Sequence, residues 1–238
     1  MGTDAHDRST GSGSKEGMGM KRTIGLVAAL MVAATLLLPG AASAAPTARL
    51  WVLHGVPGAT VDVCVNGAEV RSDFEYSQRF SAELPAGTYH ASIHAAQAGD
   101  CTGALIKGKE VDLEGGKNYT LAAGLNQGGK VRLFAFLNKL SDVADGTARV
   151  QVRHVAAAPQ VDVWVNGDVA IRNFRNGAEA TVRLAKGNYE VAVSPKGTTT
   201  VVIGPRRFAL EGHMAYQIFA TGTGEAGYRF LVLAQPTR

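Results

Sequence analysis

The feature that most constrains this chain is a set of residues that recurs one hundred positions later. Val61-Asp62-Val63 returns as Val161-Asp162-Val163, and Val65-Asn66-Gly67 returns as Val165-Asn166-Gly167. The same spacing relates several single residues: His54 and His154, Phe74 and Phe174, Leu84 and Leu184, Gly87 and Gly187, Tyr89 and Tyr189. A repeat of this length predicts two copies of one domain. Later in each copy the offset shortens by three residues, which one small change in loop length explains.

Each copy has the hydrophobic alternation of a β-protein. In residues 148–154 valines alternate with polar residues, and this period of two predicts a half-buried strand. The Asn-Gly pairs at 66–67 and 166–167 favour tight hairpin turns, because both residue types tolerate positive φ. Further strands are expected at 105–112, 118–124, 130–138, 199–210, 214–222 and 227–234. We therefore predict an all-β fold of two tandem antiparallel β-sandwiches, immunoglobulin-like or transthyretin-like, at 45–142 and 143–238.

Residues 1–44 have the organisation of a leader with a secretory signal peptide. A basic start at Lys21-Arg22 precedes an apolar run from Ile24 to Leu38, and Ala42-Ser43-Ala44 offers an A-x-A cleavage site. The alternative is a retained membrane anchor, but spanning needs about 20 apolar residues and this run is shorter. Met18 or Met20 is an alternative start of the chain. Cleavage predicts a secreted, extracellular or cell-envelope protein without stable membrane insertion.

Charge argues against nucleic-acid binding. Residues 1–44 hold four basic and three acidic residues, so the remaining chain has a net charge of +3 instead of +4. Such a mild and dispersed excess does not form the basic patch that nucleic acids require. No nucleic-acid partner is expected.

The two cysteines of the chain, Cys64 and Cys101, both lie in the first copy. An isolated pair in an exported protein is most simply a disulfide. The alternative is a reactive thiol pair, but the two residues are 37 positions apart and do not form a C-x-x-C motif.

Three motifs of the second copy carry a resemblance to a known family. They are Ala-Arg-Val-x-Val-x-His at 148–154, Val-Asp-Val-Trp-Val-Asn-Gly at 161–167 and Gly-Asn-Tyr at 187–189, and the first copy repeats them in part. The chain resembles the family known as domain of unknown function 4397 over essentially all of residues 45–238. The resemblance implies a β-sandwich in a bacterial secreted or cell-surface protein, and it brings no catalytic residues. The first copy departs from the second at Gly58 and Cys64, where the second has Ala158 and Trp164.

The recurring polar residues are interpreted as structural. His154 lies on the apolar face of its strand, so it and His54 are expected to be interior or sheet-edge histidines that bond to loop backbone. Asp162 is expected to pair with Arg149 or Arg153 or to accept loop amides, and Asp62 to act in the same way. The full set assigned to this structural motif is His54, Asp62, Asn66, Gly67, Tyr89, His154, Asp162, Asn166, Gly167 and Tyr189.

Two tryptophans are the candidate binding residues. Trp51 and Trp164, together with Tyr76 and Tyr228, have the chemistry of an aromatic platform for a glycan or a peptide. The position of Trp164 on its strand places it either at a contact between the domains or in solvent.

The sequence contains no catalytic or metal-binding motif that we recognise. G-x-S-x-G, H-E-x-x-H and a phosphate-binding glycine loop are all missing from the sequence. His90 and His94 share one face of a strand, but their spacing of roughly 13 Å is too wide for one ion, so a solvated face is expected. We therefore expect no cofactor, no metal and no catalytic residue.

The function predicted from the sequence is that of a non-enzymatic interaction or structural module of the cell envelope, with a protein or glycan partner. Two alternatives stay open: a small-ligand or glycan binder at the cleft between the domains, and an uncharacterised hydrolase. The sequence does not identify the partner.

Overall fold

In the computed structural model, residues 45–97 and 99–238 are described, and they contain strands and loops without a helix. The predicted leader, residues 1–44, lies outside the described residues. No helix in the described part of the chain has the length and apolar character needed to cross a membrane.

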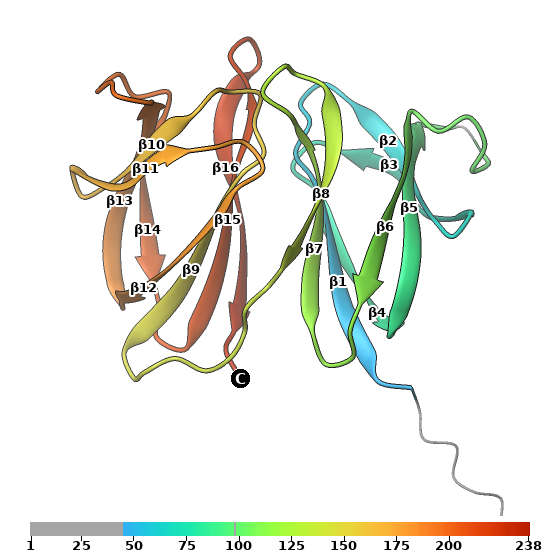
Figure 1. The fold of residues 1–238 in the computed structure, drawn as a ribbon, viewed down its shortest axis with the longest axis horizontal. Coiled ribbons are helices and arrows are strands. Elements are labelled where there is room, and N and C mark those ends of the chain that lie inside the picture. Colours follow the sequence, from blue (N-terminus) through green and yellow to red (C-terminus); the bar gives the residue numbers. More distant parts are fainter. Residues whose placement is uncertain (1–44, 98) are drawn as a thin grey trace, which may run out of the picture. The chain divides into compact units, whose positions relative to one another are not determined.

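The first copy has eight strands (Figure 1). They are β1 (Thr47–His54), β2 (Thr60–Val65), β3 (Ala68–Glu75), β4 (Arg79–Pro85), β5 (Gly87–Ala95), β6 (Ile106–Leu113), β7 (Asn118–Leu125) and β8 (Val131–Leu137). They form two four-stranded sheets, with strand orders β4-β1-β7-β8 and β3-β2-β5-β6.

The second copy repeats this arrangement. Its strands are β9 (Thr147–His154), β10 (Val161–Val165), β11 (Asp168–Phe174), β12 (Glu179–Ala185), β13 (Gly187–Pro195), β14 (Ile203–Leu210), β15 (Met214–Thr223) and β16 (Gly227–Pro236). The sheet orders are β12-β9-β15-β16 and β11-β10-β13-β14, so strand for strand the topology is that of the first copy. The predicted all-β tandem sandwich is confirmed. The predicted boundary at 142–143 falls in the interval between β8 and β9.

One detail departs from a purely antiparallel sandwich. β1 pairs with β7 in parallel, and β9 pairs with β15 in parallel. A parallel pair cannot be closed by a hairpin, because its connection has to cross over. In each copy all four strands of the second sheet lie between the two parallel partners in the sequence, so this crossover encloses the core.

The predicted hairpin turns form at both Asn-Gly pairs. Asn66 and Gly67 have φ of 50° and 78°, and Asn166 and Gly167 have φ of 51° and 89°. Glycine tolerates this left-handed region without cost, and Asn is one of the few other residues that enters it readily. The side-chain oxygens of Asn66 and Asn166 also accept the amides of the neighbouring strand, each at 2.8 Å.

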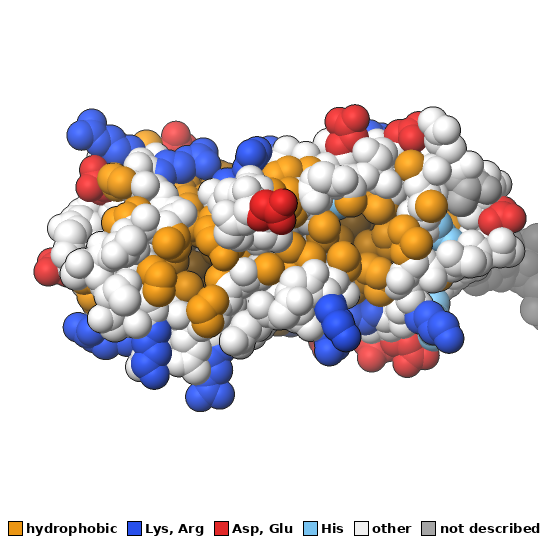
Figure 2. Space-filling model, turned by 90° about the horizontal axis from the view of Figure 1, so that it is seen from above, with side chains coloured by type: hydrophobic (Ala, Val, Ile, Leu, Met, Phe, Trp, Pro, Cys, Tyr) orange, Lys and Arg blue, Asp and Glu red, His pale blue; other side chains and the backbone are white. Residues whose placement is uncertain are grey.

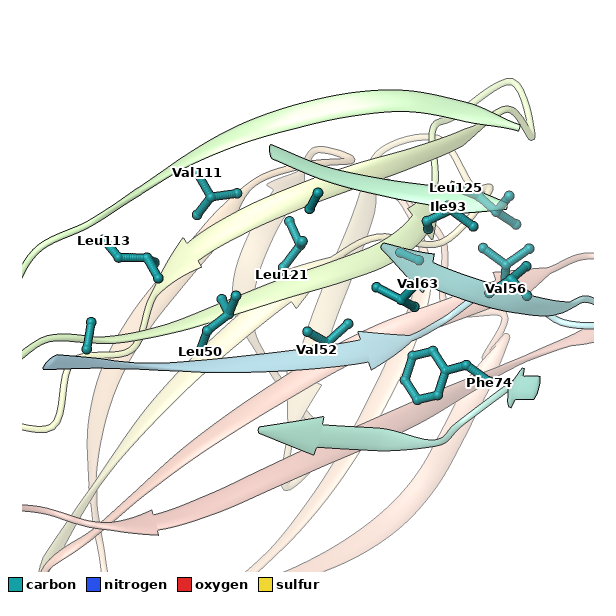
Figure 3. Close-up of a cluster of buried hydrophobic side chains, with 14 residues drawn as sticks. Leu50, Val52, Val56, Val63, Phe74, Ile93, Val111, Leu113, Leu121 and Leu125 are labelled. Carbon is teal, nitrogen blue, oxygen red and sulfur yellow. The ribbon is translucent and has the colours of Figure 1, made fainter. Parts of the chain in front are cut away.

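Alternating valines and leucines of the two sheets form the core of each sandwich. Figure 3 shows those of the first copy pointing toward one another, with Leu50 and Val52 on β1, Val63 on β2 and Leu121 on β7. Phe74 fills one end of this core and is 2% exposed. The second copy has an equivalent core around Val150, Val163 and Ile218.

Candidate functional site

The recurring tyrosines and aspartates fasten loops to strands. Tyr89 and Tyr189 donate their hydroxyls to the carbonyls of Pro85 and Ala185, at 2.8 and 2.9 Å. These bonds close the corner between β4 and β5 and its counterpart between β12 and β13. The contacts repeat in both copies, as do the residues that make them.

Asp162 bonds to loop amides, one of the two partners expected for it. Its Oδ1 accepts the amide of Asn173 at 2.8 Å, and its Oδ2 accepts the amide of Gly197 at 2.9 Å. These two backbone hydrogen bonds, the Gly197 bond first, lower the pKa of Asp162. Asp62 accepts the amide of Asp73 in the same way, at 2.9 Å. Each carboxylate therefore serves as a fixed backbone acceptor.

A cluster of buried polar side chains lies where the two copies meet. The described residues belong to one compact unit. An apolar cluster joins the copies and is called the interface here; its buried members are Leu53, Ala122, Val155, Phe219, Leu231 and Leu233. The first two belong to the first copy and the other four to the second.

The polar face of β9 is buried at this interface. Arg149, Gln151 and Arg153 alternate with valines and were expected on the solvated face of a half-buried strand, yet they are 3%, 0% and 0% exposed. The expectation was wrong because a strand with one apolar and one polar face can be buried on both, provided that the polar face meets hydrogen-bonding partners. The end of the first copy and Glu179 on β12 supply those partners.

Arg153 is held by three hydrogen bonds. Its Nε donates to Glu179 at 2.9 Å, while its two terminal nitrogens donate to the Asn138 side chain at 2.8 Å and to the Leu137 carbonyl at 3.1 Å. Its guanidinium carbon lies 4.6 Å from the ring centre of Phe136 and 5.1 Å from that of Phe219. Burial lowers the pKa of Arg153 to about 10, and Glu179 opposes that shift, so the group stays charged.

Amide side chains extend this network across the interface. Gln235 of the second copy accepts from Asn118 of the first at 2.9 Å and from the Trp51 indole at 3.1 Å. Gln235 donates to Gln217 at 3.0 Å, and Gln151 donates to the Leu137 carbonyl at 3.0 Å. The polar groups of the interface therefore bond to one another.

The four candidate aromatic residues do not gather in one place. Trp51 packs against the interface and donates to Gln235, and the Tyr76 hydroxyl bonds to Thr221 of the second copy at 3.1 Å. Trp164 donates to Ser194 at 2.8 Å, within the second copy. Tyr228 donates to the Ala157 carbonyl at 3.0 Å. Trp51 and Tyr76 thus contribute to the contact between the copies, while Trp164 is partly exposed.

Cys64 and Cys101 form the predicted disulfide, which ties the loop between β5 and β6 to β2. His94 lies beside it and is 1% exposed, so the expected solvated face for this histidine was wrong. The loop covers His94, whose Nδ1 bonds to the Thr102 carbonyl at 2.9 Å. His90 is exposed and lies 3.6 Å from Glu110.

Among the described residues, Cys64, Cys101 and His94 form the group of potential ligands whose ligand atoms lie close enough to share a metal ion. The two sulfurs and a ring nitrogen of His94 lie within 4.8 Å of one another. Metal ligation requires thiolates, and both sulfurs are used in the Cys64–Cys101 bond. As it stands, the group is a covalent link and not a ligand set.

His54 and His154 occupy equivalent positions with different surroundings. Both are 1% exposed, and in both the Nδ1 accepts the amide two residues later, at 3.2 and 3.4 Å. The Nε2 of His154 bonds to the Pro159 carbonyl at 3.1 Å, as expected for an interior histidine. Among the described residues, the Nε2 of His54 has no hydrogen-bond partner.

Comparisons with known proteins assign the chain to a family. Residues 48–164 and 155–238 both match the family described as Domain of unknown function (DUF4397). Among solved structures, the chain is similar to the TIE protein of Bacillus anthracis, at 10% identity and a TM-score of 0.26, over 70% of this chain and 32% of that one. It is also similar to a leucine-rich repeat protein from Bacteroides thetaiotaomicron VPI-5482, at 17% identity and a TM-score of 0.18, over 70% of this chain and 24% of that one. The chain thus spans less than a third of the length of either structure. No curated protein matches it significantly.

Proposed function

The chain belongs to the DUF4397 family of domains of unknown function, and on this basis we propose that it is an exported, non-enzymatic module of the cell envelope. Two sandwiches joined by the interface would act in it as one interaction or structural unit. The partner would be a protein or a glycan outside the cytoplasm.

One observation carries the non-enzymatic part of this proposal. The buried polar side chains of the interface, among them Arg153, Gln151 and Asn138, donate and accept within the network itself. A catalytic group needs an environment that leaves it free to exchange protons or attack a substrate. A saturated network instead favours rigidity, which suits a spacer or an adhesive unit.

The leader carries the export part. Residues 1–44 combine a basic start, an apolar run and an A-x-A site. The disulfide supports the same proposal, since such bonds persist in oxidising compartments.

Export is tested by fractionating cells that make the full chain and sequencing the N-terminus of the recovered protein. We expect the protein outside the cytoplasm, beginning at Ala45. A variant with Lys21→Glu and Arg22→Glu should stay in the cytoplasm. Recovery of the unaltered chain with residues 1–44 intact in the cytoplasm would contradict export.

The interaction is tested by immobilising the exported protein and capturing components of the envelope. We expect saturable capture of a discrete protein or glycan that the heat-denatured protein does not retain. Turnover of ester, peptide or glycoside substrates by the purified protein would contradict the non-enzymatic assignment and favour a hydrolase.

A further inference from the structure

The first copy has an open pocket at the end of the sandwich where β1 ends. Its volume is about 500 Å³, within the range of small-molecule sites. Val56, Val61 and Ile93 line its wall, and Leu105 and Val131, which are 65% and 40% exposed, lie at its rim. Figure 2, which shows the molecule from this end, shows the surface hollowed among hydrophobic side chains.

Two polar side chains line this pocket, the exposed Lys130 and the buried His54. The Nδ1 of His54 accepts the Val56 amide, so the proton of the neutral ring is on Nε2. That N–H is buried in the pocket wall and has no partner in residues 45–97 and 99–238. Burial, the larger of two effects, lowers the pKa of His54 to about 4, and the Ala59 carbonyl, which is outside hydrogen-bond geometry, opposes that shift. At neutral pH the group is therefore an uncharged donor, and a buried donor without an acceptor is unfavourable.

The second copy closes the same end in two ways. First, Pro159 stands at the position of Ala59 and its carbonyl accepts from His154. Second, Tyr228 stands at the position of Val131. The strand register shows this, because Val131 pairs with Leu125 in the first copy and Tyr228 pairs with Gly222 in the second. The Tyr228 side chain packs on the core there and donates to a loop carbonyl. The two copies therefore differ at this end, because the first has Ala59 and Val131 where the second has Pro159 and Tyr228.

A basic groove adjoins the pocket. It has a volume of about 400 Å³ and shares Ile106, Lys130 and Val131 with the pocket. Its further lining includes Lys107, Lys109 and Arg132, with no acidic residue among the described side chains that line it. Basic side chains beside an apolar pocket attract the negative end of a ligand whose body is apolar.

We propose that this pocket binds a small amphiphile with an apolar body, an oxygen acceptor that bonds to the His54 Nε2–H, and an anionic end that lies in the basic groove. The apolar walls account for the body of the ligand, the unpaired donor for the acceptor, and the lysines for the charge.

The first test is a fluorescence titration of the full chain with prodan, a neutral naphthalene ketone whose emission reports burial of the probe and hydrogen bonding at its carbonyl. We expect saturable binding of one probe per chain. Val131→Tyr, which copies Tyr228, should weaken binding at least tenfold. Val70→Tyr, a change at a 47% exposed site on β3 outside the pocket, should leave it unaltered. Far-UV circular dichroism checks that both variants are folded.

The second test isolates the hydrogen bond. N-phenyl-1-naphthylamine is an apolar probe without a carbonyl, so it cannot accept from His54 through one. His54→Phe should weaken prodan about fivefold relative to this probe, since a buried hydrogen bond contributes modestly. His54→Gln keeps an N–H near the same place and should restore most of the preference for prodan.

The third test addresses charge by displacement of bound prodan. Laurate should displace the probe at a lower concentration than dodecylammonium, and the difference should shrink at 0.5 M salt. The proposal is overturned if the unaltered chain shows no saturable prodan binding, or if Val131→Tyr binds as well as the unaltered chain. The proposal would also be overturned if His54→Phe weakened the binding of both probes equally, or if laurate and dodecylammonium displaced prodan at the same concentration.

Discussion

Replacing Arg153 with methionine tests whether the buried polar network holds the two copies together. Methionine keeps most of the apolar length of the side chain and can still pack between Phe136 and Phe219. The charge and the three donated hydrogen bonds are lost. The variant therefore separates the polar contribution of Arg153 from its packing.

The expected loss of stability in Arg153→Met depends on which hydrogen bonds and ion pairs its former partners keep. Asn138 still accepts from Thr120, and the Leu137 carbonyl still accepts from Gln151. Glu179 loses its closest cation while its side chain is only 20% exposed. Breaking a buried pair from one side costs about 3–5 kcal/mol. Because Gln151 and the Lys139 ammonium, 3.7 Å away, still face the Glu179 carboxylate, we expect the lower end, about 3 kcal/mol.

Urea unfolding measures this loss. Trp51 lies at the interface, so in a Trp164→Phe background, where it is the single tryptophan, its fluorescence follows the contact between the copies, while far-UV circular dichroism follows the sheets. A loss of about 3 kcal/mol lowers the midpoint by roughly 1–1.5 M if the slope is about 2–3 kcal/mol per molar urea. Arg153→Met with Glu179→Gln should recover about 1 kcal/mol or more, because the second change removes the unpaired carboxylate.

Arg49 provides the matched control. It forms the same kind of pair with Glu83, at 2.6 Å, but the two side chains are 43% and 48% exposed. Arg49→Met should therefore cost less than about 1 kcal/mol. If Arg153→Met costs no more than Arg49→Met, the network does not stabilise the interface and the reasoning from burial is refuted.

Three further predictions concern single features of the fold. Reduction of the Cys64–Cys101 bond should destabilise the first copy by about 3–4 kcal/mol, which is the chain-entropy value for a loop of this length. Thermal unfolding with and without reductant measures this loss. Two free thiols in the exported protein, found by mass spectrometry, would contradict the premise that the bond forms. Because the pKa of His54 falls from 6.5 to about 4 on folding, the unfolded chain takes up the proton first as pH drops, so about 3 kcal/mol of stability is lost between pH 6.5 and pH 4. His54→Gln should remove that part of the acid dependence of the urea midpoint, and parallel curves for the two proteins would count against the assignment. Asp162→Ala should cost about 2 kcal/mol by orphaning two loop amides, with Asp162→Asn intermediate; hydrogen exchange at Gly197 that does not change would show that the bond contributes little.

Much of the fold is visible in the sequence because short-range patterns specify it. The Asn-Gly turns and the alternating valines are local features, and each appears where the pattern predicts it. The disulfide was predictable for a similar reason, since two cysteines in one copy leave a single pairing.

The interface was beyond the same reasoning. Alternation on β9 distinguishes an apolar face from a polar one, and it does not state what covers the polar face. Arg153 is buried only because Leu137 and Asn138, at the end of the first copy, meet it with acceptors. That meeting depends on how whole sheets pack, which residue periodicity does not encode.

The pocket was missed for a different reason. Aligning the copies highlights what recurs, and His54 and His154 recur. The difference between them arises at Ala59 and Val131, small residues that attract no notice as candidates for chemistry. A comparison of what stands around each recurring residue, Pro159 and Tyr228 in the second copy, is the signal that could have revealed it.

The polar network across the interface also has a consequence for the two copies when they are produced as separate fragments. Each half would expose a surface that is partly apolar and partly polar. Its amide and guanidinium groups would lack the hydrogen-bond partners that the other half supplies. Such halves are predisposed to find each other, so the protein cut between Leu137 and Thr147 is suited to reassembly from fragments. A reporter split at this point would then signal only when both fragments occupy the same compartment.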